Sequence, residues 1–498
     1  MNHEPDFFEH LRNELRGGRM WLDRAIVLGY AVAAGLAVVA LTMAVDWVFG
    51  HFQRTFALHP WLPLITTPLI TVGIVWATRR FFGAAGGSGI PQVKAALNPA
   101  LPPERRVLFV SLRLAAGKMG LTVAGFAAGL SIGREGPSVQ IAAGVMQHAR
   151  RWLSPNTTID SRALLMAGGA AGIAAAFNAP LAGVVFAIEE LSGRIESRAS
   201  GLIITAIVLA GLVAVSAFGN TSYFGVIKVP PFGWEALLPG LLVTLASGLA
   251  GGLFGRLFIA SLTGVPGRFN QWRARFPLRF AAACGLGVAV IGVATGGTTF
   301  GAGSEAVKEM LEGHDRMPAI DTLLKFVATW LSAWAGVPGG IFAPSLSIGA
   351  GIGQVVSQVS SANLAPALIA IGMAGFLAAV TQAPLTSFII VMEMVDGHAM
   401  VLSLMAGAML ASLVSRMISR PLYDTLAEHM VAAAIGSPMP VSAAPESPAA
   451  LKPESESASS PDPDRGPSPS PSPSLGVGPD APRIDTLPPP EPESGPTR

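Results

Sequence analysis

Two charged side chains, Arg134 and Glu135, interrupt an apolar stretch of the sequence. They lie in the segment LSIGREGPSVQ, residues 130–140. An ionised side chain at the centre of a bilayer costs about 2.5–3.5 kcal/mol on insertion scales, so it persists where function or pairing compensates. A carboxylate can occupy a helix-end site that would otherwise hold an anion, and protonation removes its charge. The pattern predicts a functional role for the Glu135 carboxylate that depends on its protonation.

The alternative for Glu135 is a salt bridge with a neighbouring arginine, the ordinary role of an isolated Arg-Glu pair. Arg134 is expected to orient the turn or to support a positive potential rather than to bind an ion. Gly133 and Gly136 flank the pair and Pro137 follows. This setting is typical of a helix that starts inside a membrane, where acids are functional by default.

A second acidic pair, Glu189 and Glu190, ends the apolar segment FNAPLAGVVFAIEEL. A helix end that emerges into cytoplasmic water is enough to explain Glu189, because Glu393 stands at the same place in the second half of the chain. The counterpart of Glu190 is Met394. This asymmetry indicates that Glu190 has a role that only one half requires.

A third candidate is Ser88 in GGSGIPQVKAAL, residues 86–97. Its hydroxyl can donate a hydrogen bond to an anion. Taken alone, the segment indicates an ordinary turn followed by a helix start.

The composition indicates a polytopic membrane protein. Of the 498 residues, 51% are hydrophobic and 13% are charged, whereas soluble domains carry about a quarter charged residues. Several of the apolar stretches are too short, too long or too rich in glycine for one regular span each. The stretches lie at about 25–49, 58–78, 107–132, 163–191, 200–219, 235–262, 277–295, 320–336, 341–358, 366–395 and 399–415.

The chain lacks the patterns of disulfides, metal sites and hydrolytic enzymes. One cysteine, Cys284, excludes a disulfide within the chain and a thiol metal site, and eight scattered histidines show no HExxH or similar spacing. No GxSxG motif occurs. We therefore expect no enzyme, no metal, no cofactor and no nucleic-acid partner.

Basic residues cluster before the first apolar stretch, in mid-chain and after the last stretch. The positive-inside rule predicts that these regions, and hence both termini, face the cytoplasm. Residues 1–24 lack the pattern of a cleavable signal peptide and are expected to form a cytoplasmic segment. The clusters are Arg12, Arg16, Arg19 and Arg24; Arg268, Arg273, Arg275 and Arg279; and Arg416 and Arg420.

The two halves of the chain repeat each other. AAGIAAAFNAPLAGVVFAIEEL at 170–191 aligns with GMAGFLAAVTQAPLTSFIIVMEMV at 372–395. About 40 residues upstream of each, a Gly-rich turn with a proline opens a small-residue helix, at 133–137 and at 339–344. Ordinary helix caps at loop boundaries would explain one such turn better than two in corresponding places.

Repeats of this kind in transporters are often inverted, and the substrate binds between discontinuous helices of both halves. A helix that starts inside the membrane leaves N–H groups unpaired and has a partial positive charge at that end. Two such ends that converge form an anion site without a full positive charge. The sequence predicts an all-α polytopic membrane domain of two inverted-topology repeats with broken intramembrane helices. Repeat one is expected at about 25–262 and repeat two at about 268–430.

Four motifs together resemble the signatures of the CLC family of chloride channels and chloride/proton antiporters. The resemblance covers about residues 25–430 and implies a homodimer with a separate anion path in each subunit. The segment FNAPLAGVVFAIEE also looks like this family. The motifs are GGSGIP at 86–91, GREGP at 133–137, GGIFAP at 339–344 and PLYDTL at 421–426.

The resemblance also implies residue roles. Ser88 and Tyr423 would offer hydroxyls to a central chloride, and the backbone N–H groups of Ile341 and Phe342 would donate to it from a helix start. Glu135 would be the gating carboxylate.

Further roles follow from the same resemblance. Glu190 would be the inner proton-transfer carboxylate that marks exchangers. Lys118, seventeen residues before Glu135, would raise the potential of the path, or it would only snorkel from a helix end. Position 92 is Gln where the family leads us to expect an acid, which puts the local charge at that turn in doubt. The tail has no nucleotide-binding module, so ATP regulation is not expected.

These observations predict a secondary-active chloride/proton antiporter in the lipid bilayer of a bacterial inner membrane, with chloride and protons as its transported ions. The alternative is a passive chloride channel, voltage- or pH-gated, on the same fold. A cation transporter would line its site with acids and carbonyls instead of helix N-termini.

The segment from about residue 436 to 498 is rich in proline and serine, and no aromatic residue follows Tyr423. Such a segment buries too little apolar surface to offset the entropy of ordering, which predicts a disordered cytoplasmic tail. Deletion of residues 440–498 is therefore expected to leave anion flux in proteoliposomes unchanged. Loss of flux from a truncated protein that still folds would contradict this expectation.

Overall fold

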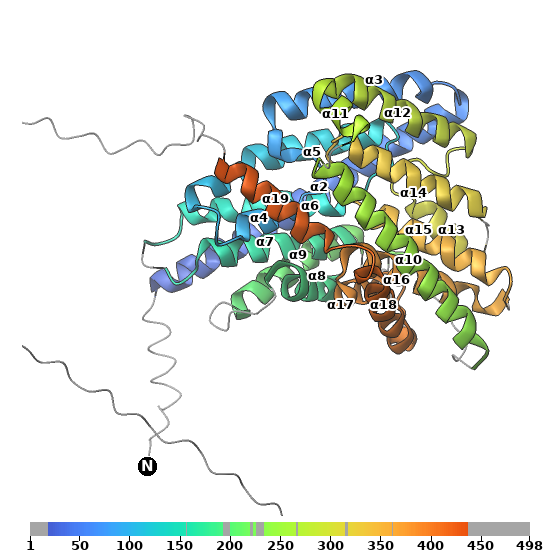
Figure 1. Cartoon of the computed structure of the whole chain (residues 1–498). Coiled ribbons are helices and arrows are strands. Elements are labelled where there is room, and N and C mark those ends of the chain that lie inside the picture. Colours follow the sequence, from blue (N-terminus) through green and yellow to red (C-terminus); the bar gives the residue numbers. More distant parts are fainter. Residues whose placement is uncertain are drawn as a thin grey trace, which may run out of the picture. The chain divides into compact units, whose positions relative to one another are not determined.

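The computed structural model describes residues 18–155, 157–192, 200–219, 223–225, 234–264, 267–313, 317–360 and 362–436. Residues 1–444 and 445–498 form two units, and every described helix belongs to the first. Helices make up most of the described residues (Figure 1), as the sequence predicts. Most of the expected N-terminal segment and nearly all of the expected tail lie outside these residues.

The described residues of the first half form eight α-helices. A 3-10 turn at Gly83–Ala85 precedes α4, and a π-helical turn, η4 at Ala187–Ser192, extends α8. The helices are α2 (Gly18–Leu58), α3 (Pro63–Phe81), α4 (Ile90–Leu97), α5 (Leu112–Ala127), α6 (Glu135–His148), α7 (Ser161–Phe177), α8 (Pro180–Phe186) and α9 (Ser200–Phe218).

In the second half the described residues form ten helices. The last of them is α19, the orange-red helix of Figure 1, which packs against α4. Across both halves, six described helices are long and apolar enough to cross a membrane. The helices of the second half are α10 (Leu237–Leu262), α11 (Arg268–Arg275), α12 (Pro277–Ala294), α13 (Ser304–Glu312), α14 (Ala319–Trp334), α15 (Phe342–Ser357), α16 (Ala365–Thr381), α17 (Pro384–Met394), α18 (Val401–Arg416) and α19 (Leu422–Gly436).

Two long apolar stretches of the sequence each fold as two helices. The chain turns between α7 and α8 at Asn178, whose φ is 55°, and between α16 and α17 at Gln382, whose φ is 60°. Both residues cap the preceding helix in the left-handed conformation. Pro180 and Pro384 then begin the next helices, because proline has a preset φ and needs no N–H partner at a first helical position.

The packing of the two halves follows one pattern. In the first half α7 packs on α6, on α2 and on α9, and in the second half α16 packs on α15, on α10 and on α18. Glycines allow the closest of these contacts: a Cβ at Gly172 would lie 2.5 Å from the carbonyl oxygen of Ser138, and one at Gly349 would lie 2.3 Å from that of Gly372. In this pattern α10 is the equivalent of α2. We therefore draw the boundary between the repeats before α10 rather than at about 262–268.

The equivalent helices α8 and α17 run antiparallel, and each is capped by an acid at the end of the other. The Glu189 carboxylate, just after α8, accepts hydrogen bonds from the N–H groups of Leu385 (3.0 Å) and Thr386 (2.6 Å) at the start of α17. The Glu393 carboxylate near the end of α17 accepts from Leu181 (3.2 Å) and Ala182 (2.7 Å) at the start of α8. Each acid thus satisfies the unpaired donors of the other helix. An antiparallel relation between equivalent helices is what inverted repeats require.

The reciprocal caps lead to a stability prediction. Glu189→Ala and Glu393→Ala should each destabilise the protein by about 1 kcal/mol, the typical cost of losing a helix cap. Thermal unfolding in detergent, followed by circular dichroism, should show a lower Tm for both variants and no change for Glu428→Ala, whose side chain is exposed on α19. A Tm equal to that of the parent in either cap variant would contradict this role.

Candidate functional site

Three Gly-rich interruptions that are far apart in the sequence meet in the fold. The N–H of Gly87 donates to the carbonyl oxygen of Val337 (3.1 Å), and the N–H of Gly339 donates to that of Gly87 (3.1 Å). Gly133 and Gly340 exchange both of their backbone hydrogen bonds at 2.7 Å. The motifs at 86–91, 133–137 and 339–344 are therefore parts of one structure.

Glu135 is the first residue of α6, and its carboxylate turns toward the start of α15. Its Oε2 accepts a hydrogen bond from the N–H of Ala343 (3.4 Å), and Glu135 is 1% exposed. In the described part of the chain Glu135 forms no ion pair, so the alternative of a salt bridge to the adjacent arginine does not hold. The carboxylate thus contacts the first turn of the helix at whose start the family resemblance leads us to expect an anion.

The residues around Glu135 explain the GREGP motif. A Cβ at Gly133 would lie 2.2 Å from Glu135 Oε2, and a Cβ at Gly136 would lie 2.3 Å from Ser88 Oγ. Both positions therefore have to be glycine, so that the Glu135 carboxylate can lie against residue 133 and the Ser88 side chain against residue 136. Pro137 lies in the first turn of α6, where a missing N–H costs no helical hydrogen bond.

Arg134 is held by partners other than Glu135. Its Nη1 lies 2.5 Å from Asp46 Oδ1, and its Nη2 donates to the Tyr223 hydroxyl at 3.1 Å. These bonds support the expectation that Arg134 orients the turn.

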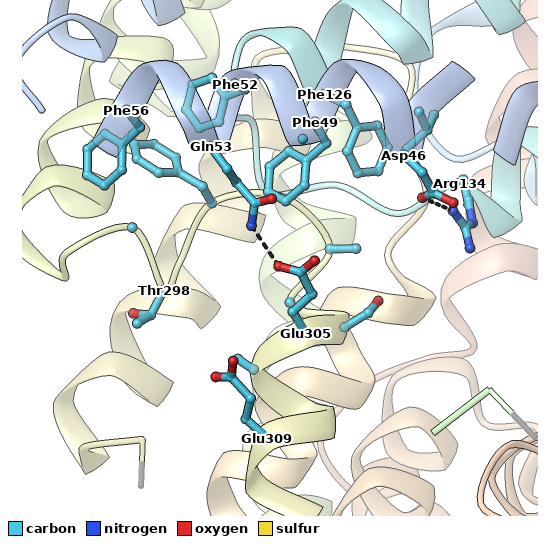
Figure 2. Close-up of a pocket in the computed structure, with 18 of the residues that line it drawn as sticks. Asp46, Phe49, Phe52, Gln53, Phe56, Phe126, Arg134, Thr298, Glu305 and Glu309 are labelled. Atoms are coloured by element: carbon cyan, nitrogen blue, oxygen red, sulfur yellow. Dashed lines mark hydrogen bonds and ion pairs between the residues drawn. The ribbon is translucent and has the colours of Figure 1, made fainter. Parts of the chain in front are cut away.

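A cavity of about 430 Å³, here called the Glu135 cavity, lies beside α6 and α13. Glu135 and Arg134 line it together with carboxylates from other helices, among them Glu305 and Glu309. Figure 2 shows these carboxylates on α13, with Glu305 bonded to Gln53 Nε2 at 2.7 Å.

A second cavity, the Tyr423 cavity, has a volume of about 290 Å³ and is lined by Ser88, Ile341 and Tyr423. Ser88 Oγ and the Tyr423 hydroxyl are buried without a hydrogen-bond partner. Two buried donors without an acceptor are what an anion would satisfy. Arg79 and Arg273 also line this cavity and add positive charge.

The backbone at the start of α15 also faces these groups. Ile341 is the N-cap of α15 and Phe342 is its first residue. Their N–H groups have no acceptor among the described residues, as expected for a helix start. The Phe342 ring packs 6.2 Å from that of Tyr423, which links α15 to α19. The structure therefore brings Ser88, Ile341, Phe342 and Tyr423 together; their binding of chloride stays a prediction.

Lys118 is fully buried on α5, so it does not snorkel. Its Nζ donates to the carbonyl oxygens of Ala85 (2.8 Å) and Gly87 (2.6 Å), beside Ser88. Gln92 closes the same turn: it accepts from the N–H of Gly89 at 2.9 Å and donates to the carbonyl of Gly86 at 2.6 Å. A neutral side chain is therefore sufficient at position 92.

Sequence reasoning missed Lys325, the equivalent of Lys118 in the second half. It is fully buried on α14 and donates to the carbonyl oxygens of Thr299 (3.0 Å) and Gly301 (2.8 Å) before α13. A signal was present, since Lys325 stands seventeen residues before the start of α15, as Lys118 stands before the start of α6.

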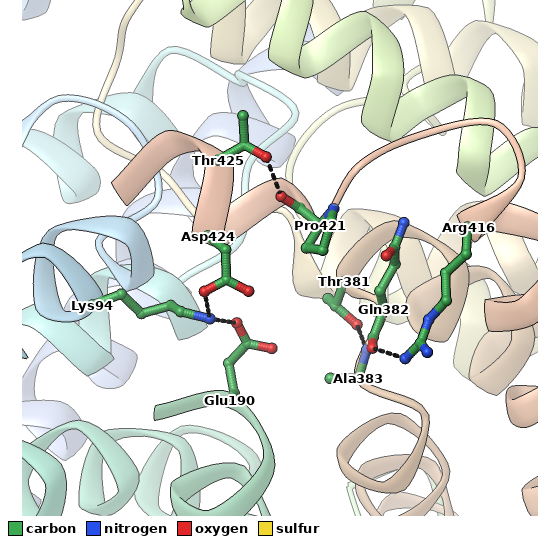
Figure 3. A network of polar contacts seen from close by, with 9 residues as sticks. All are labelled: Lys94, Glu190, Thr381, Gln382, Ala383, Arg416, Pro421, Asp424 and Thr425. Carbon is green, nitrogen blue, oxygen red and sulfur yellow. Dashed lines mark hydrogen bonds and ion pairs between the residues drawn. The ribbon is translucent and has the colours of Figure 1, made fainter. Parts of the chain in front are cut away.

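Glu190 lies in the π-helical turn after α8 and is 7% exposed. Its Oε1 is 2.7 Å from Lys94 Nζ on α4, and the same Nζ lies 2.6 Å from Asp424 Oδ1 on α19. Figure 3 shows Lys94 between the two carboxylates. Neither Lys94 nor Asp424 was predicted, because nothing in the sequence near either residue points to a distant partner.

The sequence matches known proteins over most of its length. The family model described as voltage gated chloride channel matches residues 69–416, more than half of the chain. A relative from Cronobacter sakazakii, named H(+)/Cl(-) exchange transporter ClcA, is 32% identical over 431 residues, which covers 80% of this chain and 88% of the relative. A relative of the same name from Citrobacter koseri is 30% identical over 432 residues, covering 82% of this chain and 89% of the relative.

Solved structures show the same fold. The crystal structure of a slow cyanobacterial Cl⁻/H⁺ antiporter matches with a TM-score of 0.67 at 25% identity, covering 82% of this chain and 98% of that chain. A CLC-type fluoride/proton antiporter matches with a TM-score of 0.67 at 20% identity, covering 85% of this chain and 99% of that chain, which is evidence for the fold alone. The predicted all-helical membrane fold is confirmed by these likenesses.

The unpaired hydroxyls of the Tyr423 cavity lead to a binding prediction. Ser88→Ala and Tyr423→Phe each remove one donor, and each is expected to weaken chloride binding by about tenfold, since a hydrogen bond to a charged group is worth about 1.5 kcal/mol or more. Calorimetric titration of the purified protein measures the affinity. Ser412→Ala is the control, because its Oγ is also buried and unpaired but lies on α18. Unchanged chloride affinity in a variant that combines Ser88→Ala with Tyr423→Phe would mean that the ion binds elsewhere.

Proposed function

The chain belongs to the CLC family and is an integral membrane transporter, not an enzyme, and from this premise we propose that it is a secondary-active chloride/proton antiporter. In this proposal Glu135 is the gating carboxylate and Glu190 is the inner proton-transfer residue. The relatives at 32% and 30% identity are named exchangers, which supports exchange over passive flow.

One observation carries the proposal. The Glu135 carboxylate contacts the first turn of α15, and the unpaired hydroxyls of Ser88 and Tyr423 lie in the cavity that Ile341 of the same helix start also lines. An anion at those hydroxyls and a charged Glu135 would therefore use neighbouring parts of one positive helix end. They compete for a path that only one negative group can occupy at a time.

Proton transfer follows from this competition. A proton that reaches Glu135 from the Glu135 cavity neutralises the carboxylate, which then loses its attraction to the α15 start. The carboxyl group leaves, and an anion from the Tyr423 cavity takes its place. Release of the proton toward Glu190 restores the charge on Glu135 and closes the path.

The nature of the anion is the finer part of the proposal. The named exchangers transport chloride, whereas one structural neighbour is a fluoride/proton antiporter. We favour chloride, because the relatives with the higher identity are chloride exchangers and because Ser88 follows the chloride pattern of the family resemblance.

The proposal includes a homodimer in a bacterial inner membrane, with both termini in the cytoplasm. Ser88, Glu135, Ile341 and Tyr423 all come from one chain and meet within it. This arrangement supports a complete anion path in each subunit. The supporting roles of Gly133, Arg134, Gly136, Pro137 and Lys118 are to shape the turns on which those residues lie.

The second candidate function is a passive chloride channel, which the description of the family model keeps open. The test measures proton uptake driven by a chloride gradient, together with chloride flux, in liposomes. Wild-type protein should move protons uphill. Glu135→Gln, which resembles the protonated gate, should pass chloride without protons, and Glu190→Gln should also lose proton movement while its gate stays normal.

Glu189→Gln is the matched control, because Glu189 is adjacent to Glu190 but caps α17, and it should keep the coupling. Wild-type protein that passes chloride without moving protons would establish the channel instead. A Glu190→Gln variant that still pumps would remove Glu190 from the mechanism.

A further inference from the structure

Lys94 connects the inner glutamate with the helix that carries Tyr423. Its Nζ lies 2.7 Å from Glu190 Oε1 and 2.6 Å from Asp424 Oδ1. The Lys94 side chain is 12% exposed and that of Glu190 is 6% exposed, whereas that of Asp424 is 56% exposed. One buried cation is thus shared by a buried carboxylate and an exposed carboxylate (Figure 3).

The other charged groups near Glu190 are already engaged. Glu189 on the same turn binds the start of α17, and Glu393 on α17 binds the start of α8. Helix α8 carries no titratable residue, and Arg162 of α7 donates to the carbonyl oxygen of Leu97 at 3.4 Å. Among the described residues, Lys94 is therefore the cation that forms an ion pair with Glu190, and Asp424 is the acid that competes for it.

The choice of lysine matters for this arrangement. An ammonium group is a compact charge with three donors. It can therefore bond to one carboxylate or to both while its nitrogen stays in the same place. When Glu190 binds a proton, its bond to Lys94 loses the Coulomb attraction, and Lys94 stays with Asp424. When Glu190 loses the proton, Lys94 again stabilises its charge.

We propose that Lys94 is a positioning residue shared between Glu190 and Asp424, and that the balance of its two bonds sets the pH range in which Glu190 accepts a cytoplasmic proton. The proton passes between cytoplasmic water and the Glu190 carboxylate in either direction, and Lys94 keeps its own protons throughout. This inference rests on the proposed role of Glu190 in proton transfer.

The same three residues join this balance to the anion site. Lys94 lies on α4, whose first residue follows Ser88 by two positions, and Asp424 is adjacent to Tyr423 on α19. A change in the Lys94–Asp424 bond therefore acts on α4, which follows Ser88, and on α19, which carries Tyr423. The pair is placed to report the protonation of Glu190 to those hydroxyls.

The experiment measures coupled proton transport by the full chain in liposomes at a series of symmetric pH values. Lys94→Gln removes the cation that favours the charged form of Glu190, so the midpoint of the pH dependence should move to higher pH, by about one pH unit or tenfold in proton concentration. Asp424→Asn frees Lys94 for Glu190, so its midpoint should move to lower pH. Lys94→Arg keeps the charge, so its midpoint should lie nearer to that of the wild type than the midpoint of Lys94→Gln does.

Two controls separate this role from a structural one. Glu428→Gln, an exposed acid one turn beyond Asp424 on α19, should not shift the midpoint. In a Glu190→Gln background, Lys94→Gln should leave the pH dependence of chloride flux unchanged, because the group on which it acts is gone.

Opposite shifts in the Lys94→Gln and Asp424→Asn variants are the expected result. Unshifted midpoints, or shifts in the same direction, in variants that remain coupled would overturn the inference and leave the antiporter proposal intact. If Lys94→Gln fails to fold, the Asp424→Asn shift decides alone, since that side chain is largely exposed. A wild-type protein without proton movement would overturn the antiporter proposal and this inference together.

Discussion

Backbone groups at the ends of interior helices need partners within the protein, because a bilayer core offers no water to replace them. This requirement accounts for the main polar contacts of the fold. Carboxylates meet helix starts, as Glu135 does at α15 and as Glu189 and Glu393 do at α17 and α8. Buried ammonium groups meet unpaired carbonyls, as Lys118 and Lys325 do before α4 and α13.

The site differs from these satisfied ends in one respect. The hydroxyls of Ser88 and Tyr423 and the N–H groups of Ile341 and Phe342 have no acceptor within the described chain. The neighbouring Glu135 carboxylate bonds to the N–H of Ala343 in the same helix start. In the proposed mechanism a single proton withdraws this bond, so the requirement that stabilises the fold would also provide the means of opening the path.

The sequence was informative where a residue type has a local consequence. Glycine and proline mark the interruptions because they permit close approach and begin helices, and a charged pair in an apolar stretch identifies Glu135. Contacts between distant segments had no such signal: Lys94 and Glu190 are 96 positions apart. The repeat itself would have revealed Lys325, since its spacing to α15 equals that of Lys118 to α6. The placement of α10 depends on which helices it packs against, which apolar sequence alone does not specify.

The reciprocal caps of α8 and α17 have a bearing on how such a chain originates. A contact in which each partner gives the other the same group is isologous, the kind that joins two identical subunits across a two-fold axis. The same two contacts could be closed between two copies of a half-length chain inserted in opposite orientations, with no need for a linked second half. In one chain that carries both halves, equivalent positions can hold different residues, as Glu190 and Met394 do, whereas two identical subunits always hold the same residue at both.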